Sequence, residues 1–133
     1  MQPHGINFGT GIYWSAVSKS ECERFARNPD LGDLSLRLYF AAIWRMNAIG
    51  HAEFFTGELA EVLADKSNRP LSGSGLPNAI KRAKSKGLLG ADSNARCLTL
   101  PHHHVQTAKG GRSCRTHGVR SAWQHKASTS RAA

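Results

Sequence analysis

Acidic residues are nearly absent from the second half of the sequence. Residues 66–133 hold thirteen Lys and Arg and a single acid, Asp92, whereas residues 1–65 hold five Lys and Arg and eight acids. Catalysis by paired carboxylates or by two metal ions needs clustered acids, so the basic half offers few candidates. The net charge of +9 predicts a polyanionic partner. Nucleic acid is favoured over an anionic membrane as this partner, because the sequence contains no long basic amphipathic helix with large apolar residues.

Other absences narrow the class of protein further. No apolar run is long enough for a membrane span, and the first residues lack the charged and apolar regions of a secretory signal. The three cysteines are odd in number and irregular in spacing, which argues against a disulfide framework. We therefore expect one cytoplasmic domain with tails, in the host cytoplasm or nucleoid if the protein is viral.

Motifs of catalysis are also missing. The sequence has no GxSxG elbow and no Walker loop, and the SGSG run at 72–75 is not followed by the Gly-Lys of a phosphate-binding loop. It also lacks the ordered His/Asn/His array of a metal-dependent nuclease. We expect neither an enzyme nor a cofactor.

Metal ligands remain an open alternative. Cys97 and His102, followed by Cys114-x2-His117, could supply four zinc ligands, although this spacing matches no strong zinc-finger pattern. The three consecutive histidines at 102–104 cannot all bind one ion, because neighbours in an extended segment point in alternating directions. A histidine-rich linker without metal is the favoured interpretation. Zinc bound by Cys97, His102, Cys114 and His117 is the minor one.

The most apolar segment, residues 33–49, predicts a deeply buried helix whose first turn Asp33 caps. Gly50 ends this helix, and residues 51–55 are typical of a short strand at the edge of a small sheet. Because the helix is apolar on a broad face, its aromatic residues are most simply part of the core.

Two further helices are predicted after this strand. Residues 56–65 form a short acidic helix capped by Thr56, and residues 77–86 form a basic helix that ends at Gly87. Proline at the start of the second helix is tolerated, because its missing N–H would have no partner in the first turn.

The basic helix carries the predicted nucleic-acid contacts. Asn78, Lys81, Arg82 and Ser85 have i, i+3, i+4, i+7 spacing and share one face. Asn and Arg can make paired hydrogen bonds to adenine and guanine, which favours these four residues as readers of base edges. A solvated basic face is the ordinary alternative. The residues expected on the DNA backbone are Lys66, Arg69, Ser74, Lys84, Lys86, Arg96, Lys109, Arg112 and Arg115.

A hairpin is predicted after the basic helix. Residues 88–91 and 96–100 have the composition of two short strands, and the polar residues 92–95 have turn chemistry. Arg96 would then lie near the tip, within reach of a phosphate or a minor groove.

The predicted order is helix, strand, helix, turn, basic helix and hairpin, which is that of a winged helix-turn-helix domain. The runs IGHAEFFTGELAEVL and LPNAIKRAKSKGLLGADSNARCLTLP resemble winged helix-turn-helix proteins of actinobacteria and their phages. The resemblance covers roughly residues 34–101 and implies an α+β fold. It also implies double-stranded DNA binding through Asn78, Lys81, Arg82 and Ser85, with the wing near Arg96.

The predicted winged domain divides the chain into three parts. Residues 1–32 are an N-terminal segment with a marginal helix at 15–28. Residues 33–101 are the winged domain, and residues 102–133 are a basic, flexible tail. A nonspecific phosphate tether is favoured over a minor-groove arm at residues 110–112. The role of Val119 and Trp123 in this tail stays open.

The predicted function is that of a phage or bacterial transcriptional regulator or DNA-organising protein. About two to four base readers recognise only a short site, so high specificity requires a homodimer or several copies along the DNA. The alternative is a protein-interaction module that acts on host transcription or replication machinery. In that case the acidic helix and the apolar anchors Trp14 and Phe25 matter more than the basic helix.

Overall fold

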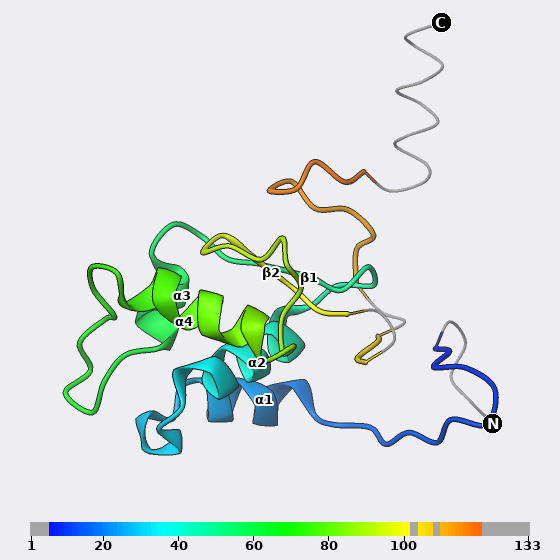
Figure 1. The fold of residues 1–133 in the computed structure, drawn as a ribbon, viewed down its shortest axis with the longest axis horizontal. Coiled ribbons are helices and arrows are strands. Elements are labelled where there is room, and N and C mark those ends of the chain that lie inside the picture. Colours follow the sequence, from blue (N-terminus) through cyan, green and yellow to red (C-terminus); the bar gives the residue numbers. More distant parts are fainter. Residues whose placement is uncertain (1–5, 102–103, 108–109, 121–133) are drawn as a thin grey trace, which may run out of the picture.

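The computed structural model describes residues 6–101, 104–107 and 110–120. It contains helices and one two-stranded antiparallel sheet, which confirms the predicted α+β class. Within these ranges, the helices are all too short or too polar to cross a membrane. The elements in chain order are α1 (Lys19–Ala26), the 3-10 turn η1 (Pro29–Leu31), α2 (Leu34–Arg45), β1 (His51–Glu53), α3 (Glu58–Val62), α4 (Gly75–Ser85) and β2 (Cys97–Thr99) (Figure 1).

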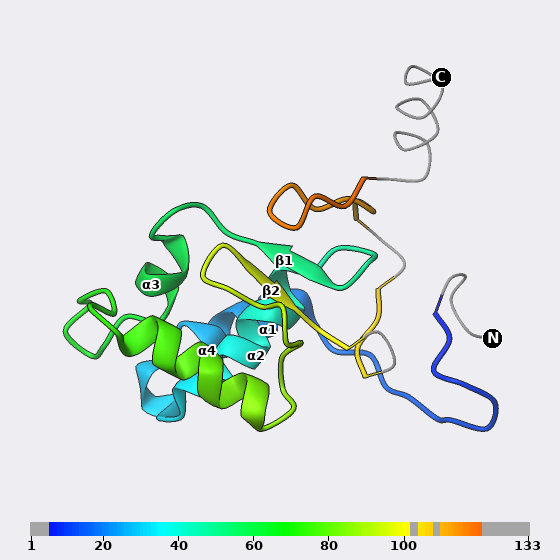
Figure 2. The ribbon, with the colours of Figure 1, turned by 45° about the horizontal axis from the view of Figure 1, so that its top comes forward.

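Helix α2 is the centre of the fold. Asp33 caps it as predicted, because its carboxylate accepts the Ser35 N–H at 2.9 Å. The helices α1 and α4 and the strand β1 all pack against α2 (Figure 2). Leu38 and Ala41 are fully buried in this contact. Helix α1 belongs to the same core, since Cys22 and Ala26 are part of the cluster around α2.

The C-terminal end of α2 comes earlier than the predicted residue 49. Met46 is extended, with ψ of 145°, and the Asn47 side chain accepts the N–H groups of Ile49 and His51, both at 3.1 Å. This side chain competes with the helix for backbone donors, which is why asparagine favours turns. The chain therefore turns directly into β1.

The sheet pairs β1 with β2, in the register His51↔Thr99 and Glu53↔Cys97. The hairpin predicted from 88–91 and 96–100 is therefore only partly present. Residues 88–91 form no strand, although the Gly90 N–H donates to the Thr99 carbonyl at 2.8 Å. The second strand forms, but its ladder partner is β1.

Helix α3 is shorter than the predicted 56–65 and lacks the predicted cap. Gly57 stands at the N-cap with φ of 80° and provides no side chain. The Thr56 hydroxyl accepts a hydrogen bond from the Arg96 guanidinium instead, at 3.0 Å. The Glu58 carboxylate reaches back to the Phe55 N–H at 2.9 Å. This contact joins the loop before α3 to the first residue of the helix, but it does not cap α3, because Phe55 lies two residues before the N-cap.

Residues 110–120 differ from the predicted flexible tail. The Ala48 N–H donates to the Gly111 carbonyl at 2.9 Å, and the Asn47 side-chain amide donates to the Ser113 carbonyl at 2.8 Å. Cys114 and Val119 then form an antiparallel bridge. This segment follows the outer side of β1 in both views (Figure 1, Figure 2). Lys109 and Trp123 lie outside the described residues.

Candidate nucleic-acid interface and cysteine–histidine cluster

Helix α4 has one buried face and one exposed face. Ala79, Ile80 and Ala83 are buried in the core. The four residues on the opposite side, all exposed, are Asn78, Lys81, Arg82 and Ser85. The helical spacing that predicts a shared face is therefore present, and the small inward residues let α4 pack closely on the core.

The two basic residues of this face have no acidic partner within the described part of the chain. Neither Lys81 nor Arg82 forms an ion pair with any residue that the structure describes. Their charges face solvent and can be offered to an anion. Ser85 differs, because its hydroxyl lies 3.2 Å from the carbonyl oxygens of both Lys81 and Arg82. It donates back into its own helix, which leaves only its lone pairs for a ligand.

The cations predicted to contact the DNA backbone fall into two groups. Lys66 and Arg69 pair with Asp30 and Asp65 at 3.3 Å, and both lysine and arginine side chains are about three-quarters exposed. Ion pairs that are this exposed contribute little to the stability of the fold, so a DNA phosphate can replace the carboxylate as the partner of each cation. Lys86 is held more firmly, because it contacts both Asp33 and Ser35. Lys84 is half-buried and Ser74 is exposed at the N-cap of α4.

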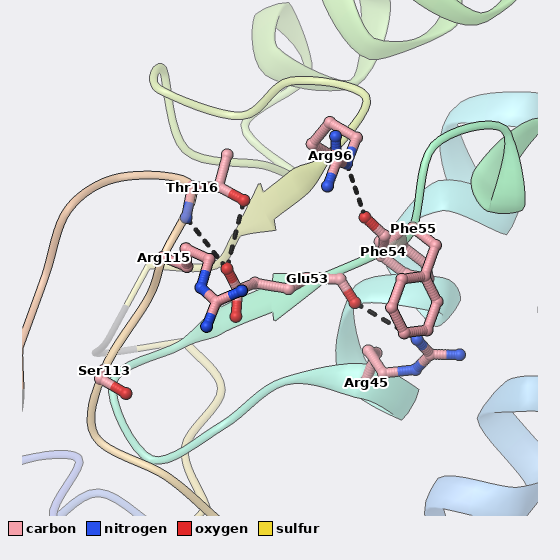
Figure 3. Close-up of a pocket in the computed structure, with 8 residues that line it drawn as sticks. All are labelled: Arg45, Glu53, Phe54, Phe55, Arg96, Ser113, Arg115 and Thr116. Carbon is pink, nitrogen blue, oxygen red and sulfur yellow. Dashed lines mark hydrogen bonds between the residues drawn. The ribbon is translucent and has the colours of Figure 1, made fainter.

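Arg96 and Arg115 line the same pocket of about 550 Å³ beside β1 (Figure 3). Arg96 is anchored, because its Nε donates to the Phe54 carbonyl at 2.9 Å. Arg45 closes another side and forms a two-pronged contact with Glu58, the shorter at 2.7 Å. Arg112 is exposed in the neighbouring segment. Only part of the predicted wing surface is thus free to meet a polyanion.

A second feature lies where residues 110–120 meet the sheet. Four residues bring one ligand atom each into a single cluster, in which the four atoms lie within 4.8 Å of one another: His51, Cys97, Cys114 and His117. The two sulfurs are 3.5 Å apart. Cys97 Sγ lies 3.6 Å from His51 Nδ1, and Cys114 Sγ lies 3.4 Å from His117 Nδ1. All three cysteines of the chain are free, and the third, Cys22, is remote in α1.

Hydrogen bonds around the cluster fix its orientation. His117 Nε2 lies 2.7 Å from the Asp92 carbonyl, so this nitrogen donates and the other ring nitrogen, Nδ1, faces the cluster. The backbone N–H of His117 donates to Cys114 Sγ, with 3.3 Å between nitrogen and sulfur. Glu53 accepts the Thr116 N–H at 3.0 Å and its hydroxyl at 3.2 Å (Figure 3), which attaches the 114–117 loop to β1.

Burial also sets the protonation of the cluster. Desolvation, followed by the neighbouring Cys114, raises the pKa of the Cys97 thiol. Desolvation, followed by the nearby His117, lowers the pKa of His51. The Thr116 N–H holds the pKa of Glu53 below its usual range. Burial therefore favours the neutral forms of the Cys97 thiol and the His51 ring.

The structure brings together three of the four residues that the sequence offered as possible zinc ligands. Cys97, Cys114 and His117 meet, whereas His102 lies outside the described residues. The fourth member is His51, which sequence spacing does not indicate. Only the strand pairing could have indicated His51 as a member of the cluster, because β1 pairs with β2 and so places His51 beside Cys97.

The sequence matches no protein-family model, and neither the curated proteins nor the solved structures contain a significant match.

Proposed function

We propose that this protein binds double-stranded DNA through helix α4, as a winged helix-turn-helix domain in which α3 and α4 form the helix pair. The observation that carries this proposal is the exposed face of α4. It presents Asn78, Lys81 and Arg82 to solvent, without acidic partners among the described residues, while its other face is buried. A helix with this division can enter a major groove without disturbing the core.

The order of the elements supports the winged interpretation. The strand β1 precedes α3, and β2 follows α4 and pairs with β1. The turn between Gly90 and Thr99 takes the place of a short wing, with Arg96 fixed beside it. We combine this order with the sequence resemblance to winged helix-turn-helix proteins of actinobacteria and their phages, and propose a DNA-binding role on both grounds. Transcriptional regulation or DNA organisation is the corresponding role.

The test is the affinity for mixed-sequence duplex DNA as a function of salt. Wild-type protein should bind with a steep fall of log affinity against log salt, because phosphate contacts release counterions. The Lys81→Glu/Arg82→Glu variant should lose at least about tenfold in affinity and show a flatter slope.

The matched control reverses two exposed charges on α1. Arg24→Glu/Arg27→Glu makes the same change in net charge, but in α1 and at its C-cap, where both arginines pair with glutamates and lie over aromatic rings. Equal loss in both variants would mean that only the overall charge matters. Absence of binding by wild-type protein at low salt would overturn the proposal.

The segment before α1, residues 6–18, supports one other function. Ile12, Tyr13 and Val17 are exposed large apolar residues, and Tyr13 is 98% exposed. Exposed apolar side chains in one segment are typical of protein contacts. A protein-interaction module is therefore the second candidate. Function in cells that survives Lys81→Glu/Arg82→Glu but is lost in Tyr13→Ser would support it over DNA binding.

A further inference from the structure

We propose that His51, Cys97, Cys114 and His117 form a zinc site that holds residues 110–120 against the sheet. The proposal stands apart from DNA binding, because none of the four residues belongs to α4. It also revises the expectation that the chain has no cofactor, and it replaces His102 by His51 in the ligand set.

The separations of the ligand atoms suit a tetrahedral ion. Zinc lies about 2.3 Å from sulfur and about 2.0–2.1 Å from nitrogen, so tetrahedral ligands should be about 3.8 Å apart for two sulfurs and about 3.6 Å for sulfur and nitrogen. The observed distances are 3.5 Å between the sulfurs, and 3.6 Å and 3.4 Å for the two sulfur–nitrogen pairs. All six pairs are within 4.8 Å, so the widest exceeds the tetrahedral separation by no more than about 1–1.5 Å.

The chemistry of the ligand set selects the metal. Two thiolates and two imidazoles form a borderline-soft set, which in tetrahedral geometry favours zinc over magnesium, calcium or manganese. Both sulfurs are buried, whereas the two imidazoles are half-buried. Four protein ligands also leave no open position for a substrate. The site is therefore structural rather than catalytic.

The surroundings match those of a metal site. The Asp92 carbonyl holds His117 in the tautomer that presents Nδ1, and such an outer hydrogen bond usually orients a histidine ligand. The His117 N–H directed at Cys114 Sγ can stabilise a thiolate. On metal binding the two thiols release their protons to solvent, so the bound Zn²⁺ and two thiolates have no net charge.

A disulfide between Cys97 and Cys114 is the competing state. It would use the two sulfurs, which are already close, but it would leave two converging imidazole nitrogens without a role. A metal accounts for all four groups. The two states differ in mass and in metal content, so one set of measurements separates them.

The experiment uses the full chain, expressed without a polyhistidine tag and purified without chelator. We expect one zinc per chain by elemental analysis. After metal removal and denaturation, all three cysteines should react as free thiols, whereas a Cys97–Cys114 disulfide would leave only Cys22 free. Exchange of zinc for Co²⁺ should give the d–d absorption of tetrahedral cobalt together with a thiolate-to-cobalt charge-transfer band.

Variants identify the ligands. Cys114→Ser and His117→Ala should each lose most of the bound zinc. Cys22→Ala, which changes the remaining cysteine, should keep it. The triple variant His102→Ala/His103→Ala/His104→Ala should also keep it, because the histidine run is not part of the proposed site.

Three results would overturn the proposal. They are wild-type protein without zinc and without the charge-transfer band under cobalt, isolation of a Cys97–Cys114 disulfide, and loss of zinc in the triple histidine variant. The stoichiometry and the cobalt spectrum are measured on wild-type protein, so the test stands even if Cys114→Ser fails to fold. Failure of DNA binding would leave this result unchanged.

Discussion

Asp33 and Lys86 join the start of α2 to the end of α4. One carboxylate oxygen of Asp33 accepts the Ser35 N–H and hydroxyl, while the other lies 3.2 Å from Lys86 Nζ. Lys86 is the C-cap residue of α4. The proposed DNA-contacting helix is thus anchored at its C-terminal end by the same side chain that caps the central helix.

This contact predicts an acid-sensitive contribution to stability. Hydrogen bonds from Ser35, followed by the one from Lys86, lower the pKa of Asp33 from 3.8 to about 2. Because the folded pKa lies below the unfolded one, the contribution is complete above pH 3.8 and is lost as the pH falls toward 2. Its size is under about 1 kcal/mol, because the pair is exposed and screened by solvent. Urea unfolding from pH 7 to pH 2 measures it.

Asp33→Asn is the matched variant for this measurement. The amide oxygen keeps a cap acceptor for Ser35 but neither titrates nor pairs with Lys86. The free energy of unfolding of this variant should fall less between pH 4 and pH 2 than that of wild-type protein. Parallel curves for the two proteins would contradict the assignment.

Arg37 predicts a larger effect on stability. Its buried guanidinium donates to the carbonyls of Ala26, Val62 and Ala64, at 2.9, 3.2 and 3.1 Å. Two of these are the last residues of α1 and α3, so one side chain satisfies the ends of both helices. Arg37→Met keeps the apolar stem but removes all donors. We expect a loss of about 2–4 kcal/mol in the free energy of unfolding, measured by urea denaturation.

The control for Arg37 is the same change at an exposed site. Arg24→Met removes an exposed guanidinium that pairs with Glu21 and lies over the Phe25 ring, so it should cost less than about 1 kcal/mol. Similar midpoints for Arg37→Met and wild-type protein would show that the three carbonyls find other partners.

Gly90 and Thr99 are packed too closely for any side chain at position 90. A Cβ there would collide with the Thr99 hydroxyl, which Asp92 holds at 2.6 Å. Gly90→Ala should therefore displace β2 and lower the free energy of unfolding by about 1–3 kcal/mol. Gly111→Ala is the control, since a Cβ at Gly111 meets nothing within 4 Å. A thermal or urea denaturation series that ranks the two variants equally would contradict this packing.

The proposed zinc site predicts a change in protease sensitivity. Removal of zinc by a chelator should release residues 110–120 from the sheet, so trypsin should cleave after Arg112 and Arg115 at least about tenfold faster. Cleavage after Arg24 in α1 should change much less, and added zinc should restore protection. Identical digestion patterns with and without chelator would show that the segment is held by hydrogen bonds alone.

Local sequence signals predicted the start of α2 and the two faces of α4, although they placed the end of α2 too late and made α3 too long. The Asp33 cap and the buried face of α2 follow from capping chemistry and apolar spacing, which act within a few residues. The exposed face of α4 was predictable for the same reason, because Ala79, Ile80 and Ala83 recur on the opposite side. These features depend little on the rest of the chain.

Features set by distant partners were not predictable. The Thr56 hydroxyl bonds to Arg96, forty positions away, so it does not cap α3. His51 joins the cysteines only because β1 pairs with β2. Nothing in the spacing of Cys97, His102, Cys114 and His117 indicates that pairing, and the ligand set expected from it was accordingly incomplete.

The strand register also determines the order of events in folding. Glu53 and Cys97 are partners in the sheet, and both α3 and α4 lie in the chain between them. Closing so long a loop is entropically costly until the intervening helices have collapsed onto α2. We therefore expect the sheet to form late. On a ribosome, strand pairing must wait until β2 has emerged, and residues 114–117 can dock only after that.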